Sequence, residues 1–387
     1  MNQTKRYANI LFVVTSLFWF SQYAYTSYVN PELEKMGVTA VFMGFVSGSY
    51  GFTQLVLRIP VGILSDKWRK KFFISAGCFC AGLSSLIMLL FQHPAAFLIG
   101  RALAGVASSS WVTFTILYSS YFTAKKASGS ITMLNAANQL GRLFSFICAG
   151  LFVSKFGASA AFLIASIGGF AAFILSLLVQ EDSSAANNAV SIRELLSVAR
   201  DRHLLITSIL AILIQLISFS TYFSFTSNYA VSINASQPQL SFMNIMLTVP
   251  CLAANFLVSR LIQVRAREKW IVFTGFLLTA AYCILLPSAA TIQQLYILQI
   301  LAGIGNAFSL SVLMGMCIQN IPVNKRSAAM GFFQSLYGIG MTVGPIIMGF
   351  ITDYAGLAAG FYIMALLSGI SAAATIFAFH KPSAVQA

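Results

Sequence analysis

Long uncharged runs of apolar residues dominate the chain. Runs of about 20 residues, the length that crosses a bilayer as a helix, occupy 8–29, 72–91, 159–179, 204–229, 239–259, 292–317, 328–351 and 358–379. Each of three further runs carries one arginine (41–64, 95–118 and 130–154), and a shorter one ends at Pro287 (270–287). The pattern predicts an all-α polytopic membrane protein of about twelve transmembrane helices. No small-residue cleavage site follows the first run, so we expect it to be retained as a helix.

The two halves of the chain repeat one another at an offset of 199 residues. The clearest matches are glycines and a phenylalanine: Gly141, Gly150, Gly157 and Phe162 recur as Gly340, Gly349, Gly356 and Phe361. We therefore expect an N-terminal six-helix bundle over 1–179, a cytoplasmic linker over the polar stretch 180–203, and a C-terminal six-helix bundle over 204–387. Within the linker, Ser191 and Glu194 form a capping-box pattern, which fits a short helix on the inner membrane face or a solvated connector equally well.

Composition and charge are also those expected of a membrane protein. Hydrophobic residues make up 58% of the 387 residues and charged residues only 8%, whereas a soluble chain is about 25% charged. The net charge of +14 does not indicate a nucleic-acid-binding protein, because the basic residues fall in alternate loops and the aromatic residues lie inside the apolar runs. Seventeen lysines and arginines lie in the segments expected inside, against two, Lys35 and Lys155, outside. This bias predicts a protein of the cytoplasmic membrane with both termini in the cytoplasm.

The residues that usually carry enzyme chemistry are absent from any one depth of the membrane. The six cysteines lie within predicted spans without metal-ligand spacing, and the three histidines lie near span ends. There is no glycine loop with a lysine for nucleotide phosphates and no paired carboxylates or serine–histidine set. We therefore expect no catalytic residue, metal or cofactor, no enzymatic activity, and no transport driven by ATP.

A basic loop follows the second predicted span and reads Gly62-Ile-Leu-Ser-Asp66-Lys67-Trp-Arg69-Lys70-Lys. It resembles the signature loop of the major facilitator superfamily, except that Arg69 stands where the family usually has a second glycine. The resemblance implies that Gly62 packs closely on span 11 and that Asp66 lies at the positive N-terminal end of that span among neighbouring bases. Such a contact would hold the halves together on the cytoplasmic side. The other interpretation is a solvated charge cluster that obeys the positive-inside rule.

Two further helices are similar to family motifs. Arg101 and Gly105 in span 4 match an arginine-x-x-x-glycine pattern that is tied to coupling in many members. Span 11 resembles the family's glycine-proline helix, in which small residues allow close packing and proline allows bending; the residues concerned are Gly340, Gly344, Pro345 and Gly349. The span-5 positions where antiporters carry a glycine-proline pair are Ser145 and Phe146 here, which weakens an assignment to efflux.

Arginines within spans indicate functional positions, because a charge in hydrocarbon is costly. Arg142 lies near the middle of span 5, and Arg58 shares a helical face with Gly62 and Asp66, which favours a role beside the loop. The resemblance implies that spans 1, 4, 7 and 10 line a central cavity. The polar and aromatic candidates there are Gln22, Tyr23, Tyr25, Trp111, Thr113, Gln215, Tyr222, Gln299 and Asn306.

All nine acids fall in predicted loops or at span ends. A carrier of lipophilic cations commonly needs an intramembrane carboxylate as counter-charge. We therefore predict a neutral or anionic small organic substrate that passes close to Arg101 or Arg142, although aromatic faces also hold cations and Glu32 or Glu34 could reach the outer mouth of a cavity.

The leading hypothesis is a monomeric secondary active transporter that works by alternating access in the bilayer, with protons as a candidate coupling ion. The alternatives are a proton-coupled multidrug efflux antiporter and a non-transporting sensor on a transporter scaffold, which would be expected to carry an added soluble domain.

Overall fold

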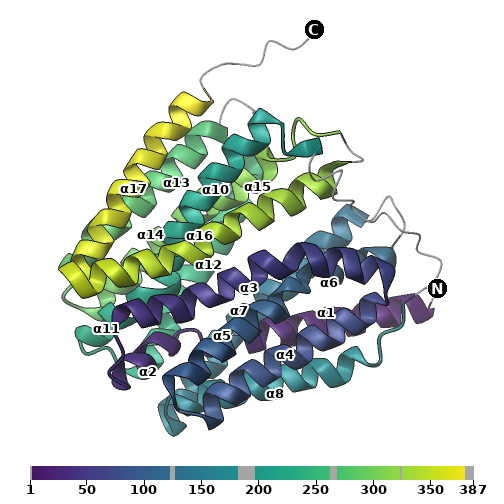
Figure 1. Cartoon of the computed structure of the whole chain (residues 1–387), viewed down its shortest axis with the longest axis horizontal. Coiled ribbons are helices and arrows are strands. Elements are labelled where there is room, and N and C mark those ends of the chain that lie inside the picture. Colours follow the sequence, from purple (N-terminus) through teal and green to yellow (C-terminus); the bar gives the residue numbers. More distant parts are fainter. Residues whose placement is uncertain (1, 123–126, 182–196, 262–267, 323–324, 380–387) are drawn as a thin grey trace.

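A computed structural model describes residues 2–122, 127–181, 197–261, 268–322 and 325–379, and none of these residues forms a β-strand (Figure 1). The predicted linker helix at Ser191 and Glu194 lies outside the described residues. The N-terminal half contains α1 (Asn2–Tyr23), α2 (Val29–Lys35), α3 (Ala40–Lys67), α4 (Lys70–Leu90), α5 (Pro94–Ser109), α6 (Trp111–Ser120), α7 (Ala127–Phe156) and α8 (Ser159–Ser176). The C-terminal half contains α10 (Arg202–Ser220), η2 (Thr221–Phe225), α11 (Thr226–Ser232), α12 (Gln237–Leu261), α13 (Glu268–Leu285), η4 (Leu286–Ser288), α14 (Ile292–Asn306), η5 (Ala307–Ser311), α15 (Val312–Met316), α16 (Arg326–Ala355) and α17 (Leu357–Ala378).

Eleven helical segments of the described chain are long and apolar enough to cross a membrane. α1 is less apolar because its first turns contain Asn2, Gln3, Lys5 and Arg6. It nevertheless has 22 residues and packs along α7 and α8. With α1 as the first of twelve, the prediction of an all-helical membrane fold of about twelve spans is confirmed.

The internal repeat corresponds to the same packing position in each bundle. A Cβ atom at Gly141 of α7 would lie 2.1 Å from the carbonyl oxygen of Ser16 in α1, and one at Gly340 of α16 would lie 2.1 Å from that of Ile212 in α10. Only glycine allows backbones to approach this closely. Gly141 and Gly340 therefore seat span 5 on span 1 in one bundle and span 11 on span 7 in the other.

Two helix pairs join the bundles: α3 lies along α16, and α7 lies along α12. Three glycines of α3 face the backbone of α16, where added Cβ atoms would lie 2.4 Å from Pro345 O (at Gly44), 2.5 Å from Thr342 O (at Gly48) and 2.7 Å from Met341 C (at Gly51). On the α16 side, a Cβ atom at Gly349 would lie 2.4 Å from Ala40 O. The first half of α3 and the second half of α16 thus form a close interface between the bundles.

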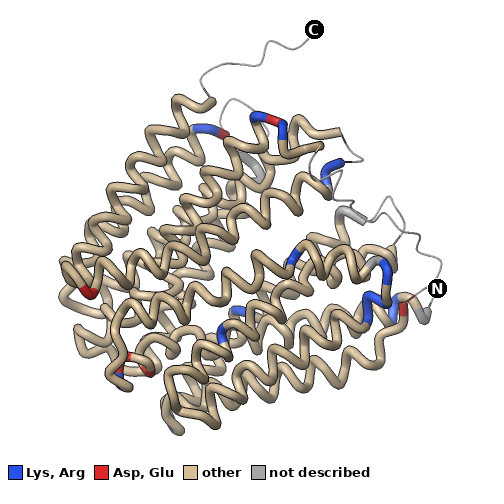
Figure 2. The backbone as a smooth tube through the Cα atoms, in the orientation of Figure 1, with Lys and Arg blue, Asp and Glu red and all other residues tan. Residues whose placement is uncertain are grey.

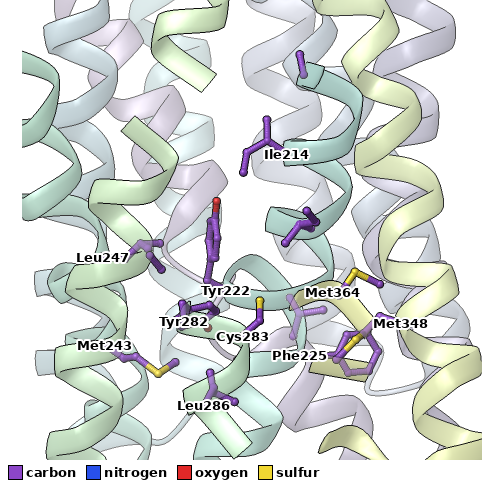
Figure 3. Close-up of a cluster of buried hydrophobic side chains, with 14 of the residues drawn as sticks. Ile214, Tyr222, Phe225, Met243, Leu247, Tyr282, Cys283, Leu286, Met348 and Met364 are labelled. Carbon is purple, nitrogen blue, oxygen red and sulfur yellow. The ribbon is translucent and has the colours of Figure 1, made fainter. Parts of the chain in front are cut away.

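The four spans expected to line a cavity are irregular helices. Spans 7 and 10 each contain a π-helical turn, η2 and η5. Span 4 is interrupted at Ser110 between α5 and α6, and span 1 ends at Tyr23 before the turn that leads to α2. Such turns often mark functional positions because they re-aim side chains. Figure 3 shows this at η2, where Tyr222 and Phe225 point in different directions within the buried cluster that includes Tyr282 and Leu286.

Charged residues gather at the ends of the bundles. Figure 2 shows most of the described lysines and arginines at the end of the molecule where α1 begins and α17 ends, which we call the inner end. The opposite, outer end includes α2 and the C-terminal end of α16. The basic loops that alternate along the sequence therefore lie together at the inner end.

Candidate functional site

A cavity of about 620 Å³ lies between the two bundles. Its walls come from α1, α3, α5, α6, α7, α10, η2, α11, α12, α14, η5, α15 and α16. Aromatic rings and side-chain amides make up much of the lining: Trp19, Tyr23, Tyr50, Trp111, Phe146, Phe219, Tyr222, Phe223 and Tyr337 supply rings, and Gln22, Gln54, Asn135, Asn138, Gln139, Gln215, Asn244, Asn255, Asn306 and Gln334 supply amides. This mixture suits an organic solute with both apolar and polar parts.

Polar contacts between the bundles close the outer end of the cavity. Four hydrogen bonds form a set that we call the outer seam: Tyr28 with Ser241 (2.6 Å), Asn30 with Ser224 (2.9 Å), Ser47 with Ser224 (2.9 Å) and Ser27 with Asn244 (2.9 Å). All of these side chains are buried. Water and solutes therefore have no free passage at this depth.

Asp353, in the last turn of α16, adds a contact above the seam. Its Oδ1 accepts a hydrogen bond from the backbone N–H of Ala40 (2.8 Å), and its Oδ2 accepts one from that of Val41 (2.9 Å). These are the first residues of α3, where backbone N–H groups have no intrahelical partner and the helix dipole is positive. The carboxylate thus ties the end of one bundle to the start of a helix in the other.

The bundles separate toward the inner end. The guanidinium of Arg58 still donates hydrogen bonds to Gln334 O and Tyr337 Oη, both at 3.3 Å. One turn further along α3, a Cβ atom at Gly62 would have Val112 of α6, at 4.0 Å, as its neighbour. The expected packing of Gly62 on α16 is therefore absent in this conformation, and Figure 1 shows that α3 and α16 diverge toward the inner end. The cavity opens at the inner end in this conformation.

The motif loop is only partly described. The side chain of Asp66 lies outside the described residues, so its expected contact with span 11 is not tested. Lys67 and Arg69 are exposed, and Lys70 lies 3.6 Å from Glu181 in an ion pair. In this conformation Lys70 therefore contacts the end of the N-terminal bundle.

Three arginines line the cavity, whereas no acidic residue does so in the described chain. Arg101 lies over the ring of Tyr50 (4.7 Å) and Arg142 over the rings of Tyr23 (4.7 Å) and Phe223 (5.2 Å). Among the described residues, the ion pairs are Lys35 with Glu32 and Lys70 with Glu181. The cavity therefore presents positive charge that no carboxylate of the described residues neutralises.

Most of the residues selected from the sequence lie at the cavity wall. Gln22, Tyr23, Arg101, Trp111, Arg142, Gln215, Tyr222 and Asn306 all line it. Gly105 does not, because it packs against α3, where a Cβ atom would lie 2.3 Å from Tyr50 O. Tyr25, Thr113 and Gln299 are buried within the bundles rather than at the wall.

Hydrogen bonds fix some of these side chains and leave others available. The hydroxyl of Tyr222 in η2 donates to Oδ1 of Asn306 (3.0 Å), the last residue of α14 before η5. Gln22 Nε2 donates to Ala104 O (3.3 Å), while Gln22 Oε1 and Gln215 Oε1 have no partner among the described residues. Both residues line the cavity, and buried acceptors of this kind are usually satisfied by ordered water or by a ligand.

Sequence reasoning missed the polar faces of α7 and α12. Asn135, Asn138 and Gln139 precede Arg142 on one face of α7, and Asn244, Cys251 and Asn255 follow a similar spacing on α12. The signal was present, since polar residues three or four apart within an apolar span mark one helical face. The family resemblance implied a cavity lined by spans 1, 4, 7 and 10, which leaves out α7 and α12.

Comparison with known proteins gives the same fold. A sequence profile of the Major Facilitator Superfamily matches residues 11–232 and 208–387. An uncharacterized MFS-type transporter of Methanocaldococcus jannaschii is 25% identical, covering 87% of this chain and 88% of its own. The proton-coupled antiporter flippase LtaA of Staphylococcus aureus is 24% identical, covering 92% of this chain and 91% of its own.

Among solved structures, the nucleoside transporter NupG superposes with a TM-score of 0.82 at 15% identity, covering 97% of this chain and all (100%) of its own. A bacterial homologue of the human lysosomal transporter Spinster, in an inward-facing and occupied conformation, has a TM-score of 0.80 at 12% identity and covers 96% of each chain.

Proposed function

Because the chain belongs to the major facilitator superfamily, we propose that it is a secondary active carrier, not an enzyme, and moves a small organic solute across the cytoplasmic membrane by alternating access. The observation that carries this proposal is the cavity between two similar bundles, closed by the outer seam and open at the inner end. A solute site that two pseudo-symmetric bundles share is suited to exposure on either side as the bundles rock.

The orientation follows from charge. The inner end carries most of the basic residues (Figure 2), and basic loops are retained in the cytoplasm. The proposal therefore places both termini in the cytoplasm and assigns the structure to an inward-facing state. Since each bundle buries its glycine-packed helices within the same chain, we propose that the carrier works as a monomer.

The cavity favours a neutral or anionic solute. Arg58, Arg101 and Arg142 lie at its wall, and no acidic residue of the described chain does. A cation entering this low-dielectric space would meet like charges without a counter-charge, which is unfavourable. An anion would instead be attracted by the three arginines.

Proton-coupled antiport is the second candidate, and the relative named as a proton-coupled antiporter flippase favours it. Among the described residues the cavity wall offers no acid to carry the proton, and the acids at the outer end are Glu32, Glu34 and Asp353. Glu34 is placed for this, because its Oε2 accepts a hydrogen bond from Asn228 of the other bundle (2.6 Å).

Transport assays test the proposal. Growth and drug-susceptibility profiling of a deletion strain should identify a solute, and proteoliposomes should then take it up down its gradient, with a pH gradient changing the rate only if protons are coupled. Asp66→Asn should slow this uptake severalfold at unchanged expression, because it weakens a contact that forms in only one state. Saturable uptake by proteoliposomes that vesicles without the protein do not show would support the proposal. Equal uptake by vesicles with and without the protein would contradict it.

A further inference from the structure

Arg142 holds its guanidinium at the cavity wall without a hydrogen-bond acceptor among the described residues. A guanidinium has five N–H donors, yet within the described chain Arg142 makes no side-chain hydrogen bond or ion pair, and its buried Nε has no partner. Its contacts are ring faces: Tyr23 at 4.7 Å and Phe146 at 5.9 Å from the N-terminal bundle, and Phe223 at 5.2 Å from the C-terminal bundle. The N–H groups of the two Nη atoms are thus left for water or for a ligand in the cavity.

Resting on the proposed function, we propose that Arg142 binds the anionic group of an aromatic organic anion whose ring lies between the aromatic side chains of the two bundles. Arg142 supplies bidentate donors for a carboxylate or a similar oxyanion. The rings of Trp19, Tyr23, Trp111, Phe146, Phe219 and Phe223 line the same cavity, and they provide stacking and edge contacts for an aromatic body. The amides of Asn138 and Gln139, on the same wall of α7, remain for polar substituents.

The other two arginines are less suited to hold the anion. Arg58 already donates to Gln334 O and Tyr337 Oη. Arg101 is 9% exposed and lies over Tyr50 and Tyr25, both in the N-terminal bundle. Arg142 alone of the three contacts rings from both bundles, so a ligand on it contacts both. The remaining charges attract an anion toward the cavity and repel a cation.

This arrangement also couples binding to closure. When the inner end closes, water leaves the cavity and an uncompensated guanidinium becomes costly to bury. An anion on Arg142 removes that cost. The empty carrier is therefore expected to occlude far less readily than the loaded one, which is the property that an exchanger of anions requires.

Three probes with one ring system and different charge test the assignment: 2-naphthoate, 2-naphthamide and 2-naphthylmethylammonium. Their affinities for the full-length protein in nanodiscs would be measured by calorimetry. We expect 2-naphthoate to bind at least about tenfold more tightly than 2-naphthamide, since a charge-assisted bidentate pair replaces a neutral contact, and the ammonium to bind most weakly. Arg142→Gln should abolish the preference of naphthoate over naphthamide. Lys155→Gln, which removes a positive charge at the exposed outer end of the same helix, should retain it.

Three results would overturn the assignment: equal or tighter binding of the ammonium, no binding of naphthoate, or an undiminished naphthoate preference in Arg142→Gln. Each would leave the carrier proposal standing, because spin-label distances compared between the parent protein and Asp353→Ala report the conformational change independently of naphthoate binding. Conversely, binding of naphthoate through Arg142 without any change of conformation would support the anion site and contradict the proposed transport function.

Discussion

Asp353→Ala is expected to increase the population with an open outer seam by about 5- to 30-fold, the factor that corresponds to about 1–2 kcal/mol. The carboxylate accepts both of its hydrogen bonds from the first two N–H groups of α3, across the bundle boundary. These bonds exist only while the outer ends touch. Their loss therefore penalises the inward-facing state and leaves the outward-facing state unchanged.

A cysteine at Ser224 in a chain without its six native cysteines provides the measurement. Ser224 is 5% exposed and bonded to Asn30 and Ser47, so an impermeant thiol reagent added outside reaches it only when the seam opens. Asp201→Ala is the matched control, because Asp201 caps α10 within one bundle, accepting from Leu204 N at 2.7 Å. An equal labelling rate in Asp353→Ala and the parent would show that Asp353 does not hold the outer end.

Gly48→Leu is expected to prevent closure of the outer seam altogether. A Cβ atom there would lie 2.5 Å from Thr342 O and 3.2 Å from Cγ1 of Ile346 on α16, well inside normal contact distance. Overpacking a fixed interface costs about 1–3 kcal/mol, but this interface can relieve the overlap by separating. The bundles would therefore remain folded and stay apart at the outer end.

Gly340→Leu is the matched control for this glycine. Its Cβ atom would lie 2.1 Å from Ile212 O within the C-terminal bundle, where no rigid-body motion relieves the overlap. Gly48→Leu should increase the labelling of a cysteine at Ser224 with little change in melting temperature, whereas Gly340→Leu should lower the melting temperature. A Gly48→Leu protein with wild-type labelling, or with the larger loss of melting temperature, would argue against a separable interface.

The helical fold followed from features that the sequence states directly. The twelve apolar runs are local features, and the 199-residue repeat is found by comparing the chain with itself. The repeated Gly141 and Gly340 have the same packing role in the two bundles. The positive charge of the spans could also be predicted from the sequence, because the arginines inside predicted spans can be counted and no acid lies in the middle of a span. Eight of the selected residues line the cavity wall; Arg101 and Arg142 were selected as charges within spans, and the others because the family resemblance implied that spans 1, 4, 7 and 10 surround a cavity.

The outer seam could not be predicted in this way. Ser27, Asn30 and Ser224 are ordinary polar residues near span ends, and their pairing depends on how the bundles dock. Asp353 looked like any acid at a span end, since only the structure shows that its neighbour is the start of α3. The expected contact of Gly62 with span 11 was absent because a sequence does not specify which of two conformations is occupied.

The most direct test of the carrier hypothesis is a pair of distance measurements between spin labels in the protein in lipid. One pair, at Lys35 and Ser236, spans the outer end, and the other, at Ser120 and Arg202, spans the inner end; all four side chains are exposed. Alternating access predicts two distances for each pair, with the outer distance long when the inner one is short, and it predicts that Asp353→Ala shifts both populations in opposite senses. A single unchanging distance for each pair, or two pairs that lengthen together, would contradict it.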